Sequence, residues 1–123
     1  MQRILIIEDE DEIRTGLTFF FEASGYCCTA AVNGYEALKA MEKERPDIII
    51  SDIMMPVLDG YEFLKIIKSK EATRTIPFII LSAKTEIEEI EKGYTLGING
   101  FLTKPFSLSE LNKLVERHLI KYT

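Results

Sequence analysis

Hydrophobic residues gather in three short unbroken runs, at residues 4–7, 48–50 and 78–81. Each run is rich in isoleucine and lacks the alternation expected of a strand with one face in water. Such runs are typical of strands in a parallel sheet that helices cover on both faces. Residues 26–30 and 101–103 are weaker candidates of the same kind. The pattern therefore predicts five strands.

Between these runs, apolar residues recur at helical spacing and mark one face of each predicted helix. The five faces consist of Ile13, Leu17, Phe20 and Phe21; Ala37, Leu38 and Met41; Phe63, Leu64 and Ile67; Ile87, Ile90 and Tyr94; and Leu108, Leu111, Leu114, Val115 and Leu119. Turn signals bound the first three helices. They are Ser24-Gly25 after the first, Arg45-Pro46 after the second and Asp59-Gly60 before the third.

The last two predicted helices differ in how firmly they should be held. Residues 85–93 contain two isoleucines among four glutamates, so this helix should have the weakest hold on the core. Ser107 is predicted to cap the last helix, with Glu110 three residues later completing a capping box. Asn99-Gly100 is predicted to be the turn that enters the fifth strand.

Strands that alternate with helices predict an α/β fold with right-handed crossovers, an open parallel sheet and helices on both of its faces. The chain of 123 residues has the length of one ordinary domain, so we expect a single domain over residues 1–123. In doubly wound sheets of this kind, ligands bind at the carboxyl ends of the strands.

Composition disfavours two classes of binding partner, nucleic acids and membranes. Lysine and arginine total 15 against 20 aspartates and glutamates, and there is no basic run, so direct nucleic-acid binding is not expected. The apolar runs are far shorter than the ~20 residues that span a bilayer, and the start of the chain lacks a signal-peptide pattern. We therefore expect a cytoplasmic protein with no membrane partner.

Several kinds of site are disfavoured. Cys27 and Cys28 are neighbours whose side chains would leave a strand on opposite sides, so they are predicted to be small buried residues without a structural disulfide. His118, the only histidine, is predicted to be solvated or at an interface. The sequence has no Gly-rich phosphate loop, no zinc-like Cys/His spacing and no nucleophile elbow.

Polar residues follow four of the predicted strands. They are Glu8 and Asp9 after the first, Ser51 and Asp52 after the third, Ser82 and Ala83 after the fourth, and Lys104 and Pro105 after the fifth. Close carboxylates oppose each other's ionisation unless a positive charge offsets them. Mg²⁺ does so with a few oxygen ligands while keeping waters for a phosphoryl ligand. We therefore expect Glu8 and Asp9 to bind a metal, with residues 10–12 serving only as the start of a helix.

Four motifs together resemble the receiver domain of bacterial two-component response regulators. They are Glu8-Asp9, DIMMPVLDG at residues 52–60, Ser82-Ala83 and FLTKPF at residues 101–106. The resemblance runs from about residue 3 to about residue 119. It implies a (βα)5 flavodoxin-like fold with a five-stranded parallel sheet in the order 2-1-3-4-5.

The resemblance also implies roles for individual residues. Asp52 matches the phosphoacceptor, which takes a phosphoryl group from a sensor histidine kinase or a phosphotransfer protein. Asp9, Asp52 and the backbone carbonyl of Met54 would hold Mg²⁺ or Mn²⁺, and Glu8 would act through a metal-bound water. Lys104 and Ser82 would bind the phosphoryl oxygens.

A conformational switch is implied as well. Phe101 stands at the switch aromatic, and Lys104-Pro105 stands at a peptide bond that is usually cis in the family. Phosphorylation would draw Ser82 and Lys104 inward and alter the surface of the fourth helix, fifth strand and fifth helix. That surface would bind a downstream effector, and the apolar last helix also permits a phosphorylation-dependent homodimer.

Three positions depart from the commonest family pattern without losing their chemistry. Glu8 replaces an aspartate, Ser82 replaces a threonine, and Phe101 replaces a tyrosine. Met54 and Lys84 flank the expected phosphoryl pocket, so Lys84→Ala is predicted to change the half-life of the acyl phosphate.

Two other functions compete with this interpretation. A Mg²⁺-dependent phosphohydrolase with an aspartyl-phosphate intermediate would use the same acids, but its pattern requires a second acid where Met54 stands. A pseudo-receiver that docks without phosphorylation would be expected to lack some site residues. A receiver, in contrast to a turnover enzyme, is labelled once and releases its phosphate slowly.

Overall fold

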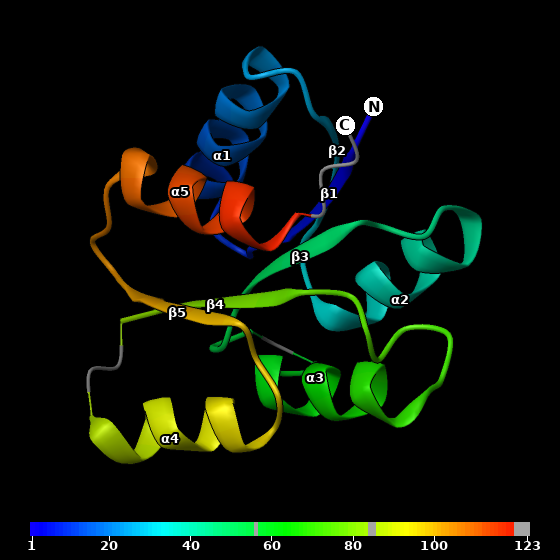
Figure 1. Ribbon diagram of the computed structural model, residues 1–123, viewed down its shortest axis with the longest axis vertical. Helices are drawn as coiled ribbons and strands as arrows, with labels where there is room; N and C mark the ends of the chain where they lie inside the picture. The colour runs from blue at the N-terminus through cyan, green and yellow to red at the C-terminus, as the bar shows by residue number, and fades with distance from the viewer. Residues whose placement is uncertain (56, 84–85, 120–123) are drawn as a thin grey trace.

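The computed structural model describes residues 1–55, 57–83 and 86–119, and in this part of the chain five strands alternate with five helices (Figure 1). The elements in chain order are β1 Arg3–Ile7, α1 Asp11–Ala23, β2 Cys27–Ala31, α2 Gly34–Lys43, β3 Ile48–Asp52, α3 Gly60–Ser69, β4 Phe78–Ser82, α4 Ile87–Thr95, β5 Gly100–Thr103 and α5 Leu108–His118. The predicted alternation is confirmed. Asp52 and Ser82 are the last residues of their strands rather than the first residues after them.

The strands form one parallel sheet in the order β2-β1-β3-β4-β5, as expected. Its register aligns the carboxyl ends of the central strands. Ile7 pairs with Ser51, and Ser82 pairs with Thr103. The residues at or just after these four strand ends therefore meet at one edge of the sheet.

Helices cover both faces of the sheet (Figure 1). On one face α1 and α5 pack against Ile4, Ile6 and other residues that share their side of the sheet. On the other face α2, α3 and α4 lie over Leu5, Ile7 and their neighbours. Both faces of β1 are therefore buried, which is why its sequence is apolar without alternation.

Side-chain caps define the starts of two helices. At α3 the Asp59 carboxylate accepts from the Glu62 amide while the Glu62 side chain accepts from the Asp59 amide, which is a complete capping box. The sequence had indicated only a turn there. At α5 the Ser107 hydroxyl accepts a hydrogen bond from the Glu110 amide at 3.0 Å, which confirms Ser107 as the N-cap.

The fourth helix differs from its prediction. It spans Ile87–Thr95 rather than 85–93, and Thr85 lies outside the described residues. Ile87 and Tyr94 were expected to face the core, but they are 71% and 50% exposed. Gly93 is the only buried residue of the helix, so the predicted weak hold on the core is confirmed. The helix lies against the edge strand β5, where neighbours are fewer than beside a central strand.

The prediction of two buried cysteines is wrong, since neither is fully buried. Cys27 is exposed and Cys28 is half-buried, because β2 is an edge strand. Both thiols are free, as expected. His118 is half-buried in the last turn of α5. In the part of the chain described here, no helix has the length and apolar character needed to cross a membrane.

Candidate functional site

Three carboxylates meet at the carboxyl edge of the sheet. Glu8 and Asp9 follow β1, and Asp52 ends its neighbour β3. One oxygen from each of the three lies within 4.8 Å of the others. Glu8 is 1% exposed and Asp52 is 5% exposed, whereas Asp9 faces solvent. The convergence predicted from the strand ends is therefore present.

A lysine from the end of β5 bridges the two buried acids. Lys104 Nζ donates to Glu8 Oε1 at 2.9 Å and to Asp52 Oδ2 at 3.0 Å. Its backbone amide donates to the carbonyl of Ser82 at 2.7 Å, which ties the lysine to the end of β4. The Lys104-Pro105 peptide bond is cis, as the resemblance implied.

The electrostatics of this group leave negative charge in excess. Burial, reinforced by the charge of Asp52, raises the pKa of Glu8 to about 7, although its bond to Lys104 opposes the change. Burial acts to lower the pKa of Lys104, but the hydrogen bonds and charges of Glu8 and Asp52 outweigh it and raise that pKa. One ammonium cannot neutralise three carboxylates. The clustered hard oxygen donors therefore fit a divalent cation such as Mg²⁺.

The backbone around Asp52 is closely held. Asp52 Oδ1 accepts from the Met54 amide at 3.2 Å, and the Ser51 hydroxyl donates to the Asp52 carbonyl at 2.8 Å. Gly60 packs against the same peptide, because a Cβ atom there would lie 2.5 Å from the Asp52 carbonyl oxygen. Sequence reasoning treated Gly60 only as a turn residue, since a close backbone approach leaves no local sequence signal.

The remaining expected residues lie around this cluster. Ser82 is fully buried at the end of β4, the strand next to β3. Phe101 is half-buried in β5 and packs against the core on the side of α3 and α4. Met54 is 59% exposed, and its backbone amide bonds to the Asp52 carboxylate. Lys84 lies outside the described residues.

Sequence reasoning missed Arg14. Its guanidinium donates to the Glu8 carbonyl at 2.9 Å and pairs with the Asp11 carboxylate. Arg14 follows the acidic run in the first turns of α1. A basic residue one helical turn after a row of acids was the available signal.

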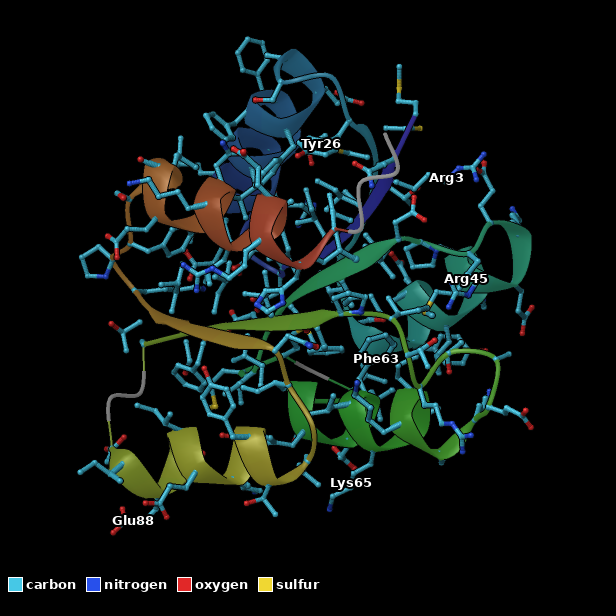
Figure 2. All side chains as sticks on the ribbon, in the orientation of Figure 1. Arg3, Tyr26, Arg45, Phe63, Lys65 and Glu88 are labelled. Carbon is cyan, nitrogen blue, oxygen red and sulfur yellow. The ribbon has the colours of Figure 1, made fainter. Side chains whose placement is uncertain are left out.

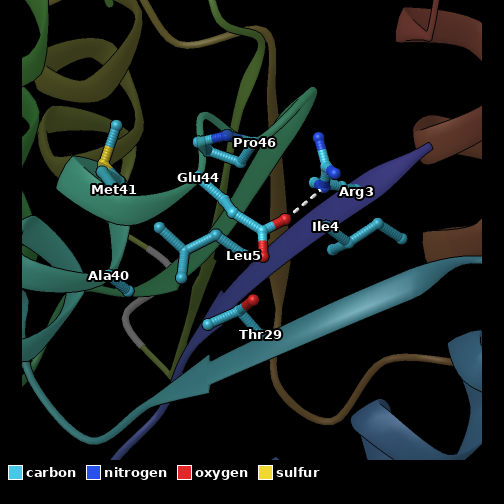
Figure 3. Close-up of a pocket in the computed structure, with 8 residues that line it drawn as sticks. All are labelled: Arg3, Ile4, Leu5, Thr29, Ala40, Met41, Glu44 and Pro46. Atoms are coloured by element: carbon cyan, nitrogen blue, oxygen red, sulfur yellow. Dashed lines mark ion pairs between the residues drawn. The ribbon is translucent and has the colours of Figure 1, made fainter. Parts of the chain in front are cut away.

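A separate pocket lies between β1, β2 and α2 (Figure 3). Arg3 and Glu44 form an ion pair beside it. Its volume is about 10 Å³, which is roughly the space of one water molecule. It holds none of the acids described above. The acidic edge of the sheet is therefore the better candidate for a functional site.

Fold and site together define a doubly wound α/β protein that gathers acids and a lysine at the carboxyl ends of its strands. The family model described as the response regulator receiver domain matches residues 4–116. The chain belongs to this family and is a receiver domain of two-component signal transduction, which is a signalling family and not an enzyme family.

Individual relatives agree with this assignment. The chain is 40% identical over 115 residues to the alkaline phosphatase synthesis transcriptional regulatory protein PhoP of Bacillus subtilis, covering 94% of this chain and 47% of PhoP. The structure of the chemotaxis protein CheY4 of Vibrio cholerae matches with a TM-score of 0.91 at 34% identity, covering 97% of this chain and 99% of CheY4.

The structure of a third relative contains a metal ion. The receiver domain of the sensor histidine kinase PA1611 of Pseudomonas aeruginosa PAO1 matches with a TM-score of 0.85 at 34% identity, covering 94% of this chain and 95% of that one. That structure has a magnesium ion coordinated in its active-site cleft. The chain spans about half the length of PhoP but nearly all of the two receiver structures.

Proposed function

We propose that Asp52 accepts a phosphoryl group from the phosphohistidine of a sensor histidine kinase or a phosphotransfer protein. The observation that carries the proposal is the buried Asp52 carboxylate, bonded to Lys104 within a cluster of three acids. A carboxylate oxygen of Asp52 would form the new P–O bond as the P–N bond breaks. The electron pair of that bond stays on the histidine nitrogen of the partner.

The surrounding residues supply alignment and charge neutralisation, which phosphoryl transfer chiefly requires. Lys104 already contacts Asp52 Oδ2 and would pair with the incoming phosphoryl oxygens. Ser82 would donate a hydrogen bond to one of them. Asp9, Asp52 and the carbonyl of Met54 would hold Mg²⁺ or Mn²⁺, with Glu8 acting through water, and the cation would neutralise charge on the transferring group. The magnesium ion in the PA1611 receiver supports this assignment.

The output would be a change of binding surface. Ser82 and Lys104 would move toward the phosphoryl group, and Phe101, which is half-buried, would turn into the space that Ser82 leaves. The surface of α4, β5 and α5 would then bind an effector or a second copy of the chain. The weak anchoring of α4 supports this choice of surface. We place this single domain, residues 1–123, in the cytoplasm.

The test is intact-mass spectrometry after incubation with acetyl phosphate and Mg²⁺. Wild type should gain one phosphoryl group, while Asp52→Asn and a sample with excess chelator should gain none. Arg45→Met, which alters an exposed residue beside Thr75, is the matched control and should be labelled like wild type. Labelling of Asp52→Asn would contradict the assignment of the acceptor.

Turnover separates this function from a phosphohydrolase. A receiver should release its single phosphate slowly and should not cycle on phosphate monoesters. Sustained release of phosphate from several monoesters would favour the enzyme. A wild type that binds Mg²⁺ but is never labelled would favour a docking module that needs no phosphorylation.

A further inference from the structure

The loop that carries Asp9 is held at both sides but not at Asp9 itself. Within the described residues, the Asp9 carboxylate has no hydrogen bond or ion pair to another side chain or to the backbone. Its direction therefore depends on the backbone of the neighbouring residues, Glu8 and Glu10. The contacts of those two neighbours decide where the Asp9 carboxylate points.

Every polar group of Glu8 is engaged. Its amide donates to the Ala31 carbonyl at 3.0 Å, and its carbonyl accepts from Arg14 Nη1 at 2.9 Å. Its carboxylate accepts from Lys104 through Oε1 and from the Glu10 amide through Oε2. Glu8 is thus bonded to β2, to Lys104 of the site and to the loop that carries Asp9.

Arg14 contacts the chain on both sides of Asp9. Its guanidinium holds the Glu8 carbonyl, and its backbone amide donates to the Glu10 carbonyl at 2.9 Å. The guanidinium is itself oriented by Asp11, and the side chain of Arg14 is only 18% exposed. The Glu8–Asp9 peptide is therefore fastened to α1 by the Arg14 side chain, while the Glu10–Asp11 peptide is fastened by the backbone of α1.

We infer that Arg14 is a positioning residue for the cation site, and that it aims the Asp9 carboxylate by clamping the Glu8–Glu10 backbone. This inference rests on the proposed function only in taking Asp9 as a metal ligand. Arg14 is not one of the proposed ligands of the cation or of the phosphoryl group. Arg14 also offsets part of the negative charge of five consecutive carboxylates, residues 8–12, through its ion pair with Asp11.

Positioning of Asp9 by Arg14 and a simple effect of the Arg14 charge predict opposite changes in Mg²⁺ affinity, which makes the inference testable. If Arg14 acted only through its positive charge, Arg14→Met would tighten Mg²⁺ binding, since a cation is repelled by a nearby guanidinium. If Arg14 positions Asp9, the same substitution weakens binding despite the removed charge. Loss of an orienting partner outside the ligand set typically weakens metal binding by about tenfold or more.

The experiment is calorimetric titration of the metal-free protein with Mg²⁺ for wild type, Arg14→Met, Arg14→Lys and Arg45→Met. Arg14→Met should raise the Kd about tenfold. Arg14→Lys keeps the charge but lacks the planar fork, so it should also raise the Kd several-fold. Arg45→Met makes the same charge change at the other end of the sheet and should bind like wild type. Circular dichroism and urea unfolding confirm that each variant is folded.

Labelling by acetyl phosphate gives an independent readout. At saturating Mg²⁺ the Arg14 variants should approach the wild-type rate, because only the affinity for the cation is reduced. An unchanged or tighter Kd for both Arg14 variants would overturn the inference. Failure of wild type to be labelled at Asp52 would overturn the proposed function instead, while the Mg²⁺ titrations still decide the role of Arg14. Absence of Mg²⁺ binding by wild type would overturn both.

Discussion

Helices α3 and α4 lie on the same face of the sheet but are held in different ways (Figure 1). Helix α3 buries five residues, Gly60, Tyr61, Phe63, Leu64 and Ile67, and begins with a complete capping box. Helix α4 buries only Gly93, and its N-cap, Glu86, makes no side-chain cap within the described residues. Figure 2 shows Phe63 between α3 and the sheet, with Glu88 of α4 pointing outward.

The difference teaches that apolar spacing alone does not state how firmly a helix is held. Both sequences carry apolar residues at helical spacing, yet α4 buries only one residue, and Tyr61 of α3 contacts it through polar groups. The Tyr61 hydroxyl shares its one proton between the carbonyl and the carboxylate of Glu89, which lie 2.9 and 2.7 Å away. Burial, together with the bond to Glu89, raises the pKa of Tyr61, so its hydroxyl stays protonated and remains a donor.

The largest expected loss of stability comes from truncating a buried side chain of α3. Phe63 is fully buried and its ring lies 5.9 Å from the ring of Phe78. Phe63→Ala should lower the free energy of unfolding by about 4 kcal/mol. Ile90→Ala, at a half-buried position in α4, should lower it by only about 1 kcal/mol. Urea denaturation measures both, and equal losses would contradict the contrast between the helices.

A second contrast concerns one glycine in each helix. Gly60→Ala would place Cβ 2.5 Å from the Asp52 carbonyl oxygen, which is backbone and cannot easily yield. It should cost about 2 to 3 kcal/mol and also slow labelling of Asp52. Gly93→Ala meets side chains rather than backbone, namely the Cδ1 atom of Ile98 at 2.8 Å and the Cδ1 atom of Ile80 at 3.4 Å.

The helix propensity gained at Gly93 should offset those contacts, leaving the free energy of unfolding within about 1 kcal/mol of wild type. Thermal and urea unfolding of the two alanine variants provide the comparison. A Gly60→Ala variant as stable as wild type would show that the α3 end of the site can shift freely.

The smallest expected effect is also the most specific for α4. Tyr61→Phe removes the donor to Glu89 and should cost about 1 kcal/mol. Amide hydrogen exchange should quicken in α4 while the amides of α3 remain protected. Lys92→Met, which removes the ammonium 4.2 Å from the Tyr61 ring, is the matched control and should cost about half as much. Faster exchange in both helices would mean that Tyr61 supports α3 rather than joining the two.

Much of the fold followed from the chain alone. Unbroken isoleucine runs identify strands covered on both faces, because each of their side chains must leave water. The convergence of Glu8, Asp52 and Lys104 could also be predicted, since parallel strands bring their carboxyl ends to one edge of the sheet. The exposure of Cys27 and Tyr94 could not be predicted, because a local pattern does not show which strands and helices lie at an edge of the sheet.

What the sequence by itself determined is the set of chemical groups and the edge at which they gather. Only the tertiary structure decided which of them are buried, which bond to one another and which residues hold them in place. Arg14 and Gly60 show the reason for this difference. Arg14 bonds to the backbone carbonyl of Glu8, six residues earlier in the chain, and Gly60 lies against the backbone of Asp52 at the end of β3. Contacts to backbone atoms do not depend on the partner's side chain, so they leave no pattern of residue types to read.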